Sequence, residues 1–337
     1  VDDGQAHFVA QSGVAGTYGT FTLNEQGQWN YQLDNSKPAV QALKTGDSVT
    51  DSFKLTSADG TAHQVTVTVT GKDDGAVIGG ADTAVVSEDG NVNAGHLDAT
   101  GQLTIIDPDA GHSQFIAQTA TPGTYGEFTV DATGAWHYQA NNSRTDIQQL
   151  KVGESLTDTL TVTSTDGTTH QIQITINGTN DAPTLTAQAQ AVTEDGARLT
   201  GHMVATDVDR GDTQTYSTQN PPAGFTLNAD GSYSFDPSNA AYQHLTAGQT
   251  QDVVIPVTVT DNAGATSTRN LTITVTGTND AAVVSGRLTN TLTEDSVVST
   301  GGMLRAGGQL TVVDPDAGEA VFVVQAGVTG VGHYGSF

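Results

Sequence analysis

The stretches that decide the fold are HQVTVTVTG (63–71), HQIQITING (170–178) and RNLTITVTG (269–277). In each of them apolar and polar residues alternate with a period of two, which is typical of a half-buried β-strand. The apolar residues are expected to face a core and the threonines or glutamines between them to face solvent. Each stretch therefore predicts one long strand of a β-structure, and its recurrence predicts that this structure is repeated.

The glycine that ends each of these stretches opens a short acidic segment, GKDD (71–74) or GTND (178–181 and 277–280). The spacings are 178 − 71 = 107 and 277 − 178 = 99 residues, the size of a compact sandwich domain. We divide the chain at these segments. The predicted domains are a partial repeat at 1–74, complete repeats at 75–181 and 182–280, and a partial repeat at 281–337.

Other motifs keep the same order within each repeat. TYGTFTLNEQGQWNYQ (17–32) and TYGEFTVDATGAWHYQ (124–139) each predict a β-hairpin with its turn at a glycine. A single helical turn is expected at 36–43, 143–150 and 238–245, each followed by a glycine stop signal. The predicted fold class is all-β. We expect immunoglobulin- or cadherin-like β-sandwich domains that follow one another in an elongated tandem array.

Aromatic residues recur in the second strand of the hairpin, as Trp29, Trp136 and Tyr233. We interpret them as core or near-core residues. The alternative is a platform on which a sugar stacks. Tyr18, Tyr125 and Tyr334 are interpreted in the same way.

Negative charge dominates the composition, with 37 Asp and Glu against 11 Lys and Arg and a formal net charge of −26. Nucleic acid and anionic membrane surfaces repel such a chain, so neither is expected as a partner. The chain has no cysteine, so disulfides do not stabilise its domains, and metal ions are one substitute. The sequence has no run of 18 apolar residues, so no membrane insertion is expected in this segment. Its first and last residues fall within the repeat pattern, which indicates a section of a longer chain.

The acidic residues recur at four positions of the repeat. They are a Glu-Asp pair after the opening strand, a D-x-D loop after the next strand, the junction segment itself, and a turn before the last strand. These positions hold, in that order, Glu88, Asp89, Glu194 and Asp195; Asp107, Asp109, Asp207, Asp209, Asp314 and Asp316; Asp73, Asp74, Asn180, Asp181, Asn279 and Asp280; and Asp166 and Asp261. Further copies are Asp2 and Asp59 in the first repeat and Glu294-Asp295 in the last.

Calcium is the cofactor that this pattern favours, because it takes six to eight oxygen ligands and two carboxylates in one loop can converge on it. The sequence has neither an EF-hand loop nor the glycine-rich nonapeptide repeat, so ligands must come from separate parts of the chain. Each single D-x-D motif is also good turn chemistry. The recurrence of all these positions in step, together with the net charge, favours calcium.

GHMVATDVDRGDTQTYS (201–217), VTVTDNAG (257–264) and GTNDAP (178–183) resemble the cadherin plan. GTYGEFTVDATGAWHYQANNS (123–143) resembles the VCBS repeats of large secreted bacterial adhesins of the RTX and biofilm-associated kind. The resemblance covers almost the whole chain. It implies an extender segment of an extracellular adhesin, exported by a type I system to the bacterial cell surface, that supports cell adhesion and biofilm formation.

The cadherin resemblance implies how the acidic residues group at three junctions, with neighbouring repeats of the chain as each other's partners. The first junction would use Asp73, Asp74, Asp107, Asp109 and Asp166. The middle one would use Glu88, Asp89, Asn180, Asp181, Asp207, Asp209 and Asp261, and the last Glu194, Asp195, Asn279, Asp280, Asp314 and Asp316. The chain departs from the cadherin pattern in its shorter linkers and in lacking an L-D-R-E motif, which puts the number of ions in each junction in doubt.

Enzymatic activity is not expected. No cysteine nucleophile, phosphate-binding loop or H-E-x-x-H motif is present, and acidic groups copied into every repeat indicate structure rather than a unique catalytic cleft. His63 and His170 recur at one strand start, where a solvated strand end is the simpler interpretation. The alternative function is a binding module in which the repeats grip cell-surface glycans or proteins, and the segment STQNPPAGF (217–225) is its best candidate.

Overall fold

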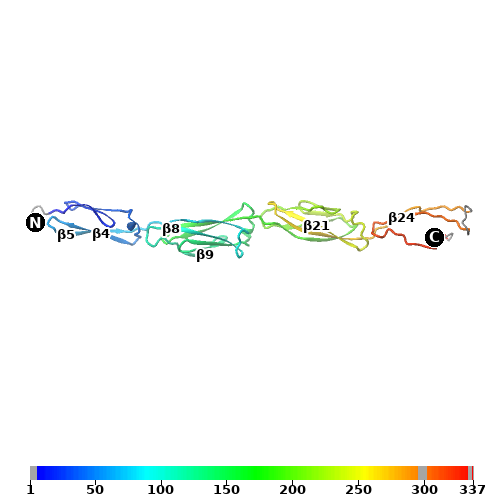
Figure 1. Ribbon diagram of the computed structural model, residues 1–337, viewed down its shortest axis with the longest axis horizontal. Coiled ribbons are helices and arrows are strands. Elements are labelled where there is room, and N and C mark those ends of the chain that lie inside the picture. Colours follow the sequence, from blue (N-terminus) through cyan, green and yellow to red (C-terminus); the bar gives the residue numbers. More distant parts are fainter. Residues whose placement is uncertain (1–5, 295–301, 333–335, 337) are drawn as a thin grey trace. The chain divides into compact units, whose positions relative to one another are not determined.

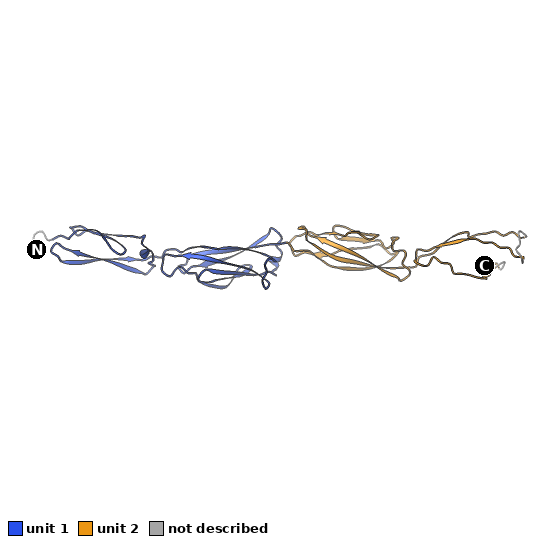
Figure 2. Ribbon diagram, in the orientation of Figure 1, with its two compact units in different colours: residues 1–179 blue, residues 180–337 orange. Residues whose placement is uncertain are grey.

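The computed structural model describes residues 6–294, 302–332 and 336. Asp2, Asp295 and Tyr334 lie outside these residues, so the expectations for them are not addressed. The chain divides into two compact units, residues 1–179 and 180–337 (Figure 2). The units are described separately below.

Residues 75–179 form a β-sandwich of two sheets (Figure 1). Its elements are β6 (Val77–Gly80), β7 (Thr83–Ser87), β8 (His96–Ile106), β9 (Gln118–Pro122), β10 (Gly126–Val130), β11 (Ala135–Asn141), α2 (Thr145–Gln148), β12 (Ser155–Thr163) and β13 (Thr169–Asn177). One sheet has the order β6-β8-β11-β10-β9 and the other the order β12-β13-β7. All pairings are antiparallel except that β7 runs parallel to β13.

The core of this repeat lies between the two sheets. Alternate residues of β13, Ile172, Ile174 and Ile176, are fully buried and meet Phe128 and Tyr138 from the other sheet. Each such side chain contributes roughly 1.5–3 kcal/mol by leaving water. The period-two pattern of HQIQITING is therefore the pattern of a strand with one face in the core, as the sequence predicts.

Residues 6–71 contain fewer strands. They form β1 (Gln11–Ala15), β2 (Gly19–Leu23), β3 (Trp29–Leu33), α1 (Pro38–Gln41), β4 (Ser48–Thr56) and β5 (Ala62–Thr70). The strands make a three-stranded sheet β1-β2-β3 and a hairpin β4-β5. The predicted turn lies at Gly27, which has a φ of 84°, a left-handed value that glycine adopts without strain. The core cluster has only four buried residues, Phe21, Leu23, Phe53 and Leu55.

Unit 180–337 begins with a second complete sandwich. Its strands are β14 (Thr184–Leu185), β15 (Gln188–Thr193), β16 (Leu199–His202), β17 (Ala205–Thr206), β18 (Thr215–Ser217), β19 (Phe225–Leu227), β20 (Ser232–Phe235), β21 (Thr250–Thr260) and β22 (Thr266–Thr276). They form the sheets β15-β22-β21-β18, β16-β20-β19 and β14-β17. The fully buried Phe235, Val257 and Ile273 belong to its core cluster.

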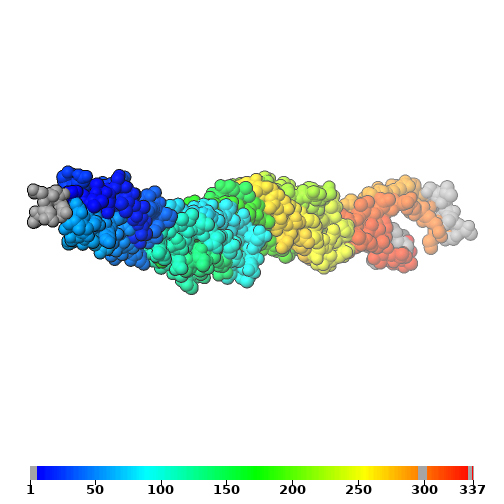
Figure 3. All heavy atoms as spheres, turned by 60° about the vertical axis from the view of Figure 1, so that its left-hand side comes forward, coloured from blue at the N-terminus to red at the C-terminus, as the bar shows by residue number. Residues whose placement is uncertain are grey.

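The final stretch contributes the antiparallel pair β23 (Val283–Gly286) and β24 (Leu310–Val313). Its apolar side chains are largely exposed: Leu310 by 41%, Phe322 by 48% and Val323 by 86%. In the space-filling view the orange and red atoms of this stretch surround an open gap, whereas the cyan to yellow repeats are filled (Figure 3). In its described residues this stretch has one two-stranded sheet and no second sheet packed on it.

A buried aspartate explains the Gly-Thr-Tyr-Gly motif. Asp158 of β12 is 1% exposed, and its carboxylate accepts hydrogen bonds from the backbone N–H groups of Thr124, Tyr125 and Gly126 at 2.7, 2.9 and 3.0 Å. The Tyr138 hydroxyl donates a further bond at 3.1 Å. A Cβ atom on Gly123 would lie 2.4 Å from the carboxylate, which is why the motif begins with glycine.

Asp51 makes the same arrangement in residues 6–71, with the N–H groups of Thr17 and Tyr18 and the Tyr31 hydroxyl as donors. Burial alone would raise the pKa of Asp51, but these hydrogen bonds hold it below the usual value. Burial and the bond to Asp51 raise the pKa of Tyr31 to about 12. The carboxylate is therefore ionised and the phenol neutral across the ordinary pH range.

The structure differs from the sequence predictions for residues 238–245 and for Trp29. Helical turns form at α1 and α2, but residues 238–245 form a turn in which the Asn239 side chain accepts the N–H of Ala241 and the Asn239 carbonyl accepts the N–H of Tyr242. The local Asn side chain competes there with helix formation. Trp136 and Tyr233 are each 3% exposed, as expected of core residues, whereas Trp29 is 51% exposed because β3 has no strand on its other side among the described residues.

Candidate metal centres

The D-x-D loop of the second repeat starts where β8 ends. Within it the N–H of Asp109 donates to Asp107 Oδ1 at 2.8 Å, so the loop folds over its own first carboxylate. The N–H of Asp74, in the junction segment, donates to Asp109 Oδ2 at 2.7 Å. The loop and the junction segment are thereby joined by a hydrogen bond to an aspartate that is 2% exposed.

One carboxylate oxygen of each aspartate in this D-x-D loop is buried. Among the described residues, neither Asp107 Oδ2 nor Asp109 Oδ1 has a hydrogen-bond partner. A buried charge that is not compensated costs several kcal/mol. Oxygen atoms of this kind are what a hard divalent cation needs as ligands.

Asp73 and His112 complete the cluster around Asp109. One ligand atom from each of the three residues lies within 4.8 Å of the others, and His112 Nδ1 is 3.9 Å from Asp109 Oδ2. Asp73 is held in place by Thr45, whose N–H donates to it at 2.9 Å. Sequence reasoning placed Asp73 and Asp109 together but overlooked His112.

The equivalent loop in unit 180–337 has the same bonds. The N–H of Asp209 donates to Asp207 Oδ1 at 3.1 Å, and the N–H of Asp181 donates to Asp209 Oδ2 at 3.0 Å. Asn180 donates to Asp261 Oδ2 at 2.9 Å. Asp207 Oδ2 and Asp209 Oδ1 are again buried and have no hydrogen-bond partner within the part of the chain that is described.

A three-carboxylate cluster lies beside this loop. Asp207, Asp212 and Asp261 each bring one oxygen within 4.8 Å of the others. Two carboxylates about 4 Å apart repel by roughly 4 kcal/mol near a protein surface. The sequence prediction included Asp207 and Asp261 but not Asp212.

The third loop, after β24, has the arrangement of the other two. The N–H of Asp316 donates to Asp314 Oδ1 at 3.0 Å, and the N–H of Asp280 donates to Asp316 Oδ2 at 2.9 Å. Asp316 is 2% exposed and its Oδ1 has no hydrogen-bond partner among the described residues. Asp314, Asp316 and Glu319 form a further cluster of ligand atoms within 4.8 Å.

Glu194 lies with this third group. It is 1% exposed, and its Oε1 accepts the N–H of Thr278 at 2.6 Å. Burial, partly offset by that bond, raises the pKa of Glu194, and the charges of Asp280, Asp316 and Asp195 raise it further. The pKa of Asp280 is likewise raised by burial and by Asp195, Asp316 and Asp314. Asn279 donates to the carbonyl of Asp280 at 2.6 Å.

Burial also raises the pKa of Asp207 and of Asp209, and neighbouring carboxylates, Asp212 and Asp261 among them, add to the rise. The raised pKa values at the loops of Asp207 and Asp316 indicate that these two loops gather more negative charge than their hydrogen bonds compensate. Such a site gains from a cation, which would remove the repulsion and supply a partner for the buried oxygens.

In contrast to these groups, the two aspartates in the turns before the last strands, Asp166 and Asp261, have lowered pKa values. Although burial acts to raise it, the pKa of Asp166 is lowered strongly by hydrogen bonds from Ser164, Thr168 and the N–H of Ala76. The pKa of Asp261 is lowered against burial by bonds from Asn180, Gly264 and Ala265. Asp166 ties its turn to Ala76, just after the first junction segment, and Asp261 ties its turn to Asn180 of the next junction segment. Both carboxyl groups are ionised at neutral pH.

The Glu-Asp pairs divide their roles. Glu88 is fully buried, and its Oε1 accepts the N–H of Thr179 at 3.1 Å, as Glu194 does from Thr278. Asp89 is exposed, with a φ of 54°, and it bonds Asn142 and Gln148 at 2.6 and 3.1 Å. Asp89 thus supports the loop before α2 in its own repeat.

The residues that sequence reasoning missed share one position. His112, Asp212 and Glu319 each stand three residues after the second aspartate of the loop, in DPDAGH, DVDRGD and DPDAGE. Each donates its N–H to the carbonyl of that aspartate, at 3.2, 3.4 and 3.2 Å. The turn brings the side chain back to the carboxylates, so the fixed offset in the sequence was the available signal.

The other proposed binding elements are integrated into the fold. In the segment 217–225, the Ala223 carbonyl accepts the Tyr242 hydroxyl at 2.9 Å, and Thr218 donates to Pro256 at 2.7 Å. His170 Nε2 lies 3.0 Å from Asp82 at the start of β13. Within the described residues no helix is long and apolar enough to cross a bilayer.

Comparison with known structures finds similarity to extracellular domains of animal cadherins. Protocadherin gamma B7 cadherin domains 1–4 are 17% identical, with 94% of this chain and 76% of that chain covered and a TM-score of 0.43. Mouse cadherin-23 EC22–24 is 15% identical over 82% of this chain and 88% of that chain, with a TM-score of 0.45. Drosophila N-cadherin EC1–4 is 14% identical over 95% and 79%, with a TM-score of 0.30.

Among curated proteins, none matches the chain. A family model described as a bacterial cadherin-like domain matches residues 1–71, 73–178 and 180–277. The three matches follow one another and together cover most of the chain. The chain therefore belongs to the bacterial cadherin-like domain family, of which it contains three consecutive copies.

Proposed function

We propose that this chain is an extender segment of a secreted bacterial adhesin, in which calcium ions at the D-x-D loops fix each repeat to its neighbour. Tandem cadherin-like domains are typical of extracellular adhesion proteins and are generally not enzymes. In this role the repeats carry a distant adhesive domain away from the cell and bear tension, and they support biofilm formation. Export by a type I system, as in RTX adhesins with VCBS repeats, is part of the proposal.

One observation carries the proposal. In each of three loops, Oδ2 of the second aspartate accepts a hydrogen bond from the N–H of a junction aspartate. Oδ1 of the same residue is buried and has no hydrogen-bond partner among the described residues. The three residues are Asp109, Asp209 and Asp316. An identical unsatisfied atom in three loops is not explained by turn chemistry, which satisfies its own carboxylates. A cation bound at each of the three loops explains it.

The residues present fit a calcium ion. Its first ligands at each loop would be the two carboxylates of the D-x-D motif, with Asp73 and His112 beside Asp109, and Asp212 and Asp261 beside Asp207. At the third loop Glu194, Asp280 and Glu319 would join them. Calcium prefers oxygen to nitrogen, so His112 makes the first loop the weakest of the three. The ion would supply positive charge between carboxylates that otherwise repel.

The junction segments are the elements on which that charge acts. Asp74 and Asp280 each bond a loop aspartate through the backbone, so the position of the carboxylate also determines the position of the linker. Without calcium the surrounding carboxylates repel and the linker can pivot. Extracellular modules of this kind bind calcium with a Kd on the order of 10⁻⁴–10⁻³ M, so external calcium would stiffen the segment and the low calcium inside a cell would leave it pliant.

Calcium titration of the whole chain tests the proposal. Isothermal titration calorimetry should show saturable binding of Ca²⁺ with a Kd near that range, and thermal unfolding should shift upward relative to excess EGTA. Mg²⁺ at the same concentration should have a much smaller effect because it demands octahedral geometry and loses its water reluctantly. Identical unfolding curves in Ca²⁺ and EGTA would refute the proposal.

A further inference from the structure

The residue three places after the second loop aspartate differs in chemistry among the three loops. In the first loop it is His112, which offers an imidazole nitrogen, whereas Asp212 and Glu319 offer carboxylate oxygens. The turn itself does not require a particular side chain here, because the backbone N–H of His112 makes the bond to the Asp109 carbonyl at 3.2 Å. The histidine therefore changes the ligand atoms of the first loop and not its backbone.

The imidazole of His112 lies beside another side chain that lacks a partner. Its Nδ1 atom is buried and has no hydrogen-bond partner among the described residues. The side chain of Asp109 is fully buried, and its Oδ1 atom has no partner within the same part of the chain. Buried polar atoms without partners are destabilising. Both atoms therefore indicate a ligand that the chain itself does not supply.

The distance between these two side chains fits a shared ion better than a direct hydrogen bond. His112 Nδ1 lies 3.9 Å from Asp109 Oδ2, which is too far for a hydrogen bond. In the same repeat His137 and His170 each lie 3.0 Å from an aspartate oxygen, which is hydrogen-bonding distance. Ligand atoms that lie about 2.1 Å from one Zn²⁺ ion are about 3–4 Å from each other. The separation at His112 is therefore that of two ligands on one ion.

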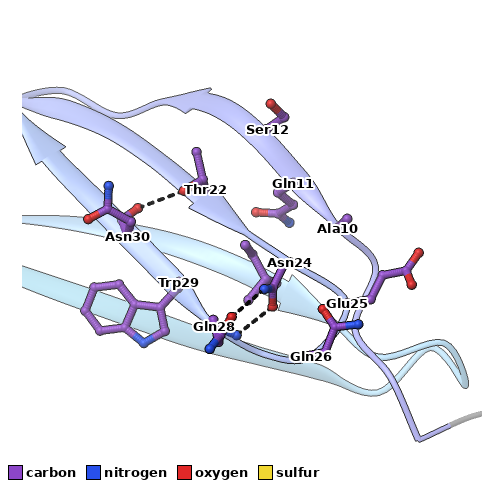
Figure 4. A pocket seen from close by; sticks show the side chains of 11 residues that line it. Ala10, Gln11, Ser12, Thr22, Asn24, Glu25, Gln26, Gln28, Trp29 and Asn30 are labelled. Carbon is purple, nitrogen blue, oxygen red and sulfur yellow. Dashed lines mark hydrogen bonds between the residues drawn. The ribbon is translucent and has the colours of Figure 1, made fainter.

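A pocket elsewhere in the chain shows how polar side chains behave without such a site. In the shallow pocket at the hairpin of β2 and β3, Asn24 donates to Gln28 Oε1 at 2.8 Å, and Thr22 donates to the Asn30 carbonyl at 3.4 Å (Figure 4). These polar groups pair with one another. The loop of His112 instead brings together two side chains that each keep an unpaired buried atom.

Asp73 supplies a third ligand from the junction segment. One of its oxygens lies within 4.8 Å of the ligand atoms of Asp109 and His112. The Thr45 N–H donates to Asp73 Oδ1 at 2.9 Å, and the Thr45 hydroxyl accepts the N–H of Asp73 at 3.1 Å. These two bonds fix Asp73 in place, so the three ligands are arranged before an ion binds.

The donor atoms decide which ion each loop prefers. Calcium and magnesium take oxygen ligands, and the clusters that contain Asp212 and Glu319 consist of carboxylates. An imidazole nitrogen suits Zn²⁺ and other first-row transition metals. Zn²⁺ accepts histidine and carboxylate ligands together, and three protein ligands leave its fourth position to water. The first loop therefore offers the ligands of a transition metal, and the other two offer those of calcium.

We propose that the first loop binds a transition-metal ion of the Zn²⁺ type, with a nitrogen ligand from His112 and oxygen ligands from Asp109 and Asp73. This inference rests on the proposed function, because it takes the three loops to be cation sites and separates one of them by its donor atoms. Since Asp73 belongs to the junction segment, the ion fixes the first linker independently of the calcium bound at the other loops. One chain then responds to two kinds of ion.

Exchanging the residue types of two loops tests the assignment. Calorimetric titration of Zn²⁺ into the whole chain, in millimolar Ca²⁺, should show one tight site. His112→Asp, which gives the first loop the carboxylate of the second, should weaken Zn²⁺ binding at least about tenfold. Asp212→His should create a second Zn²⁺ site. The control is His170→Gln, which removes a histidine already bonded to Asp82 and should leave the Zn²⁺ affinity unchanged.

Equal Zn²⁺ affinity of the original chain and His112→Asp would overturn the proposal, as would an equal loss in His170→Gln. Nuclear magnetic resonance supplies a readout that does not depend on stability. In a chain labelled with ¹⁵N-histidine, Zn²⁺ should shift the Nδ1 resonance that is missing from the His112→Asp spectrum, and Ca²⁺ should move it far less. No Zn²⁺-induced shift of that resonance would also overturn the proposal.

Failure of this inference differs from failure of the calcium proposal. If the first loop does not prefer a transition metal, Zn²⁺ leaves the His112 resonance in place while Ca²⁺ still raises the unfolding temperature. If the calcium proposal fails, unfolding is the same in Ca²⁺ and in EGTA, while Zn²⁺ added without chelator still shifts the His112 resonance.

Discussion

The two carboxylate oxygens of Asp109 differ in their hydrogen bonding. Oδ2 accepts the N–H of Asp74, while Oδ1 is buried with no hydrogen-bond partner among the described residues. The carboxylate of Asp73 also lies near that of Asp109. The charge of Asp109 therefore destabilises the metal-free protein and would stabilise the metal-bound one. A substitution that keeps the shape and removes the charge should act in opposite directions in the two states.

We expect Asp109→Asn to raise the free energy of unfolding in EGTA by about 1 kcal/mol, because the repulsion from Asp73 is removed. The unfolding temperature should rise accordingly, by roughly 4 °C. In Ca²⁺ the same change should weaken binding at least tenfold. Asp131→Asn is the control, since that exposed carboxylate is bonded by Thr133 and Ala135 in its own turn. Calorimetry with and without Ca²⁺ measures both effects. If Asp109→Asn and Asp131→Asn behave alike in Ca²⁺, Asp109 is not a ligand.

Asp158 is the second residue whose role can be isolated. Both of its oxygens accept backbone N–H groups, so Asp158→Asn would direct an NH₂ group at donors and should destabilise its repeat by about 3 kcal/mol. Tyr138→Phe removes one hydroxyl bond from the same carboxylate and should cost only about 1 kcal/mol. Urea unfolding of the two variants measures the difference. Equal losses would mean that the Tyr hydroxyl, not the backbone clamp, carries the stabilisation.

At the scale of the elements, the D-x-D loops make stability depend on pH. Glu194, Asp207, Asp209 and Asp280 all have raised pKa values, so the folded protein holds protons that the unfolded chain releases. Their protonation stabilises the fold fully below the usual carboxyl pKa, and this stabilisation is lost as the pH rises through the raised values.

In EGTA, unit 180–337 should therefore resist urea better at about pH 5 than at about pH 7.5. In Ca²⁺ the trend should reverse, because protons compete with the metal for the same oxygens. Asp261, with a lowered pKa, remains ionised in this window and does not contribute to the trend. Stability in EGTA that increases toward neutral pH would contradict this assignment of the charges.

Much of the fold was predictable at this scale because burial is periodic. HQIQITING alternates Ile172, Ile174 and Ile176 with polar residues, and the structure buries those three. The parallel pairing of β7 with β13 was not predictable, because partners distant in sequence are chosen by packing. Asp158 was also missed, since one aspartate in an alternating strand carries no signal that it will be buried.

The candidate site was predictable in part because its residues recur in each repeat. Repetition identified Asp107, Asp109 and their equivalents, and the structure shows that Asp74 and Asp280 bond these loops. The position held by His112, Asp212 and Glu319 was overlooked because its residue type changes from copy to copy. Trp29 was expected in or near the core but is 51% exposed, because β3 has a neighbouring strand on one side only among the described residues.

At the scale of the whole molecule, the proposal concerns how one repeat is oriented relative to the next. The complete repeats have separate cores, so a fragment of residues 75–280 is expected to fold and to be free of both partial repeats. It contains the loops of Asp107 and Asp207, and the linker between them.

Small-angle X-ray scattering of this fragment in millimolar Ca²⁺ and in excess EGTA tests the proposed calcium clamp most directly. We expect the maximum dimension to be larger and the distance distribution narrower in Ca²⁺, because a fixed linker removes bent arrangements. Scattering curves that coincide in the two buffers would show that the acidic loops do not control the orientation of the repeats.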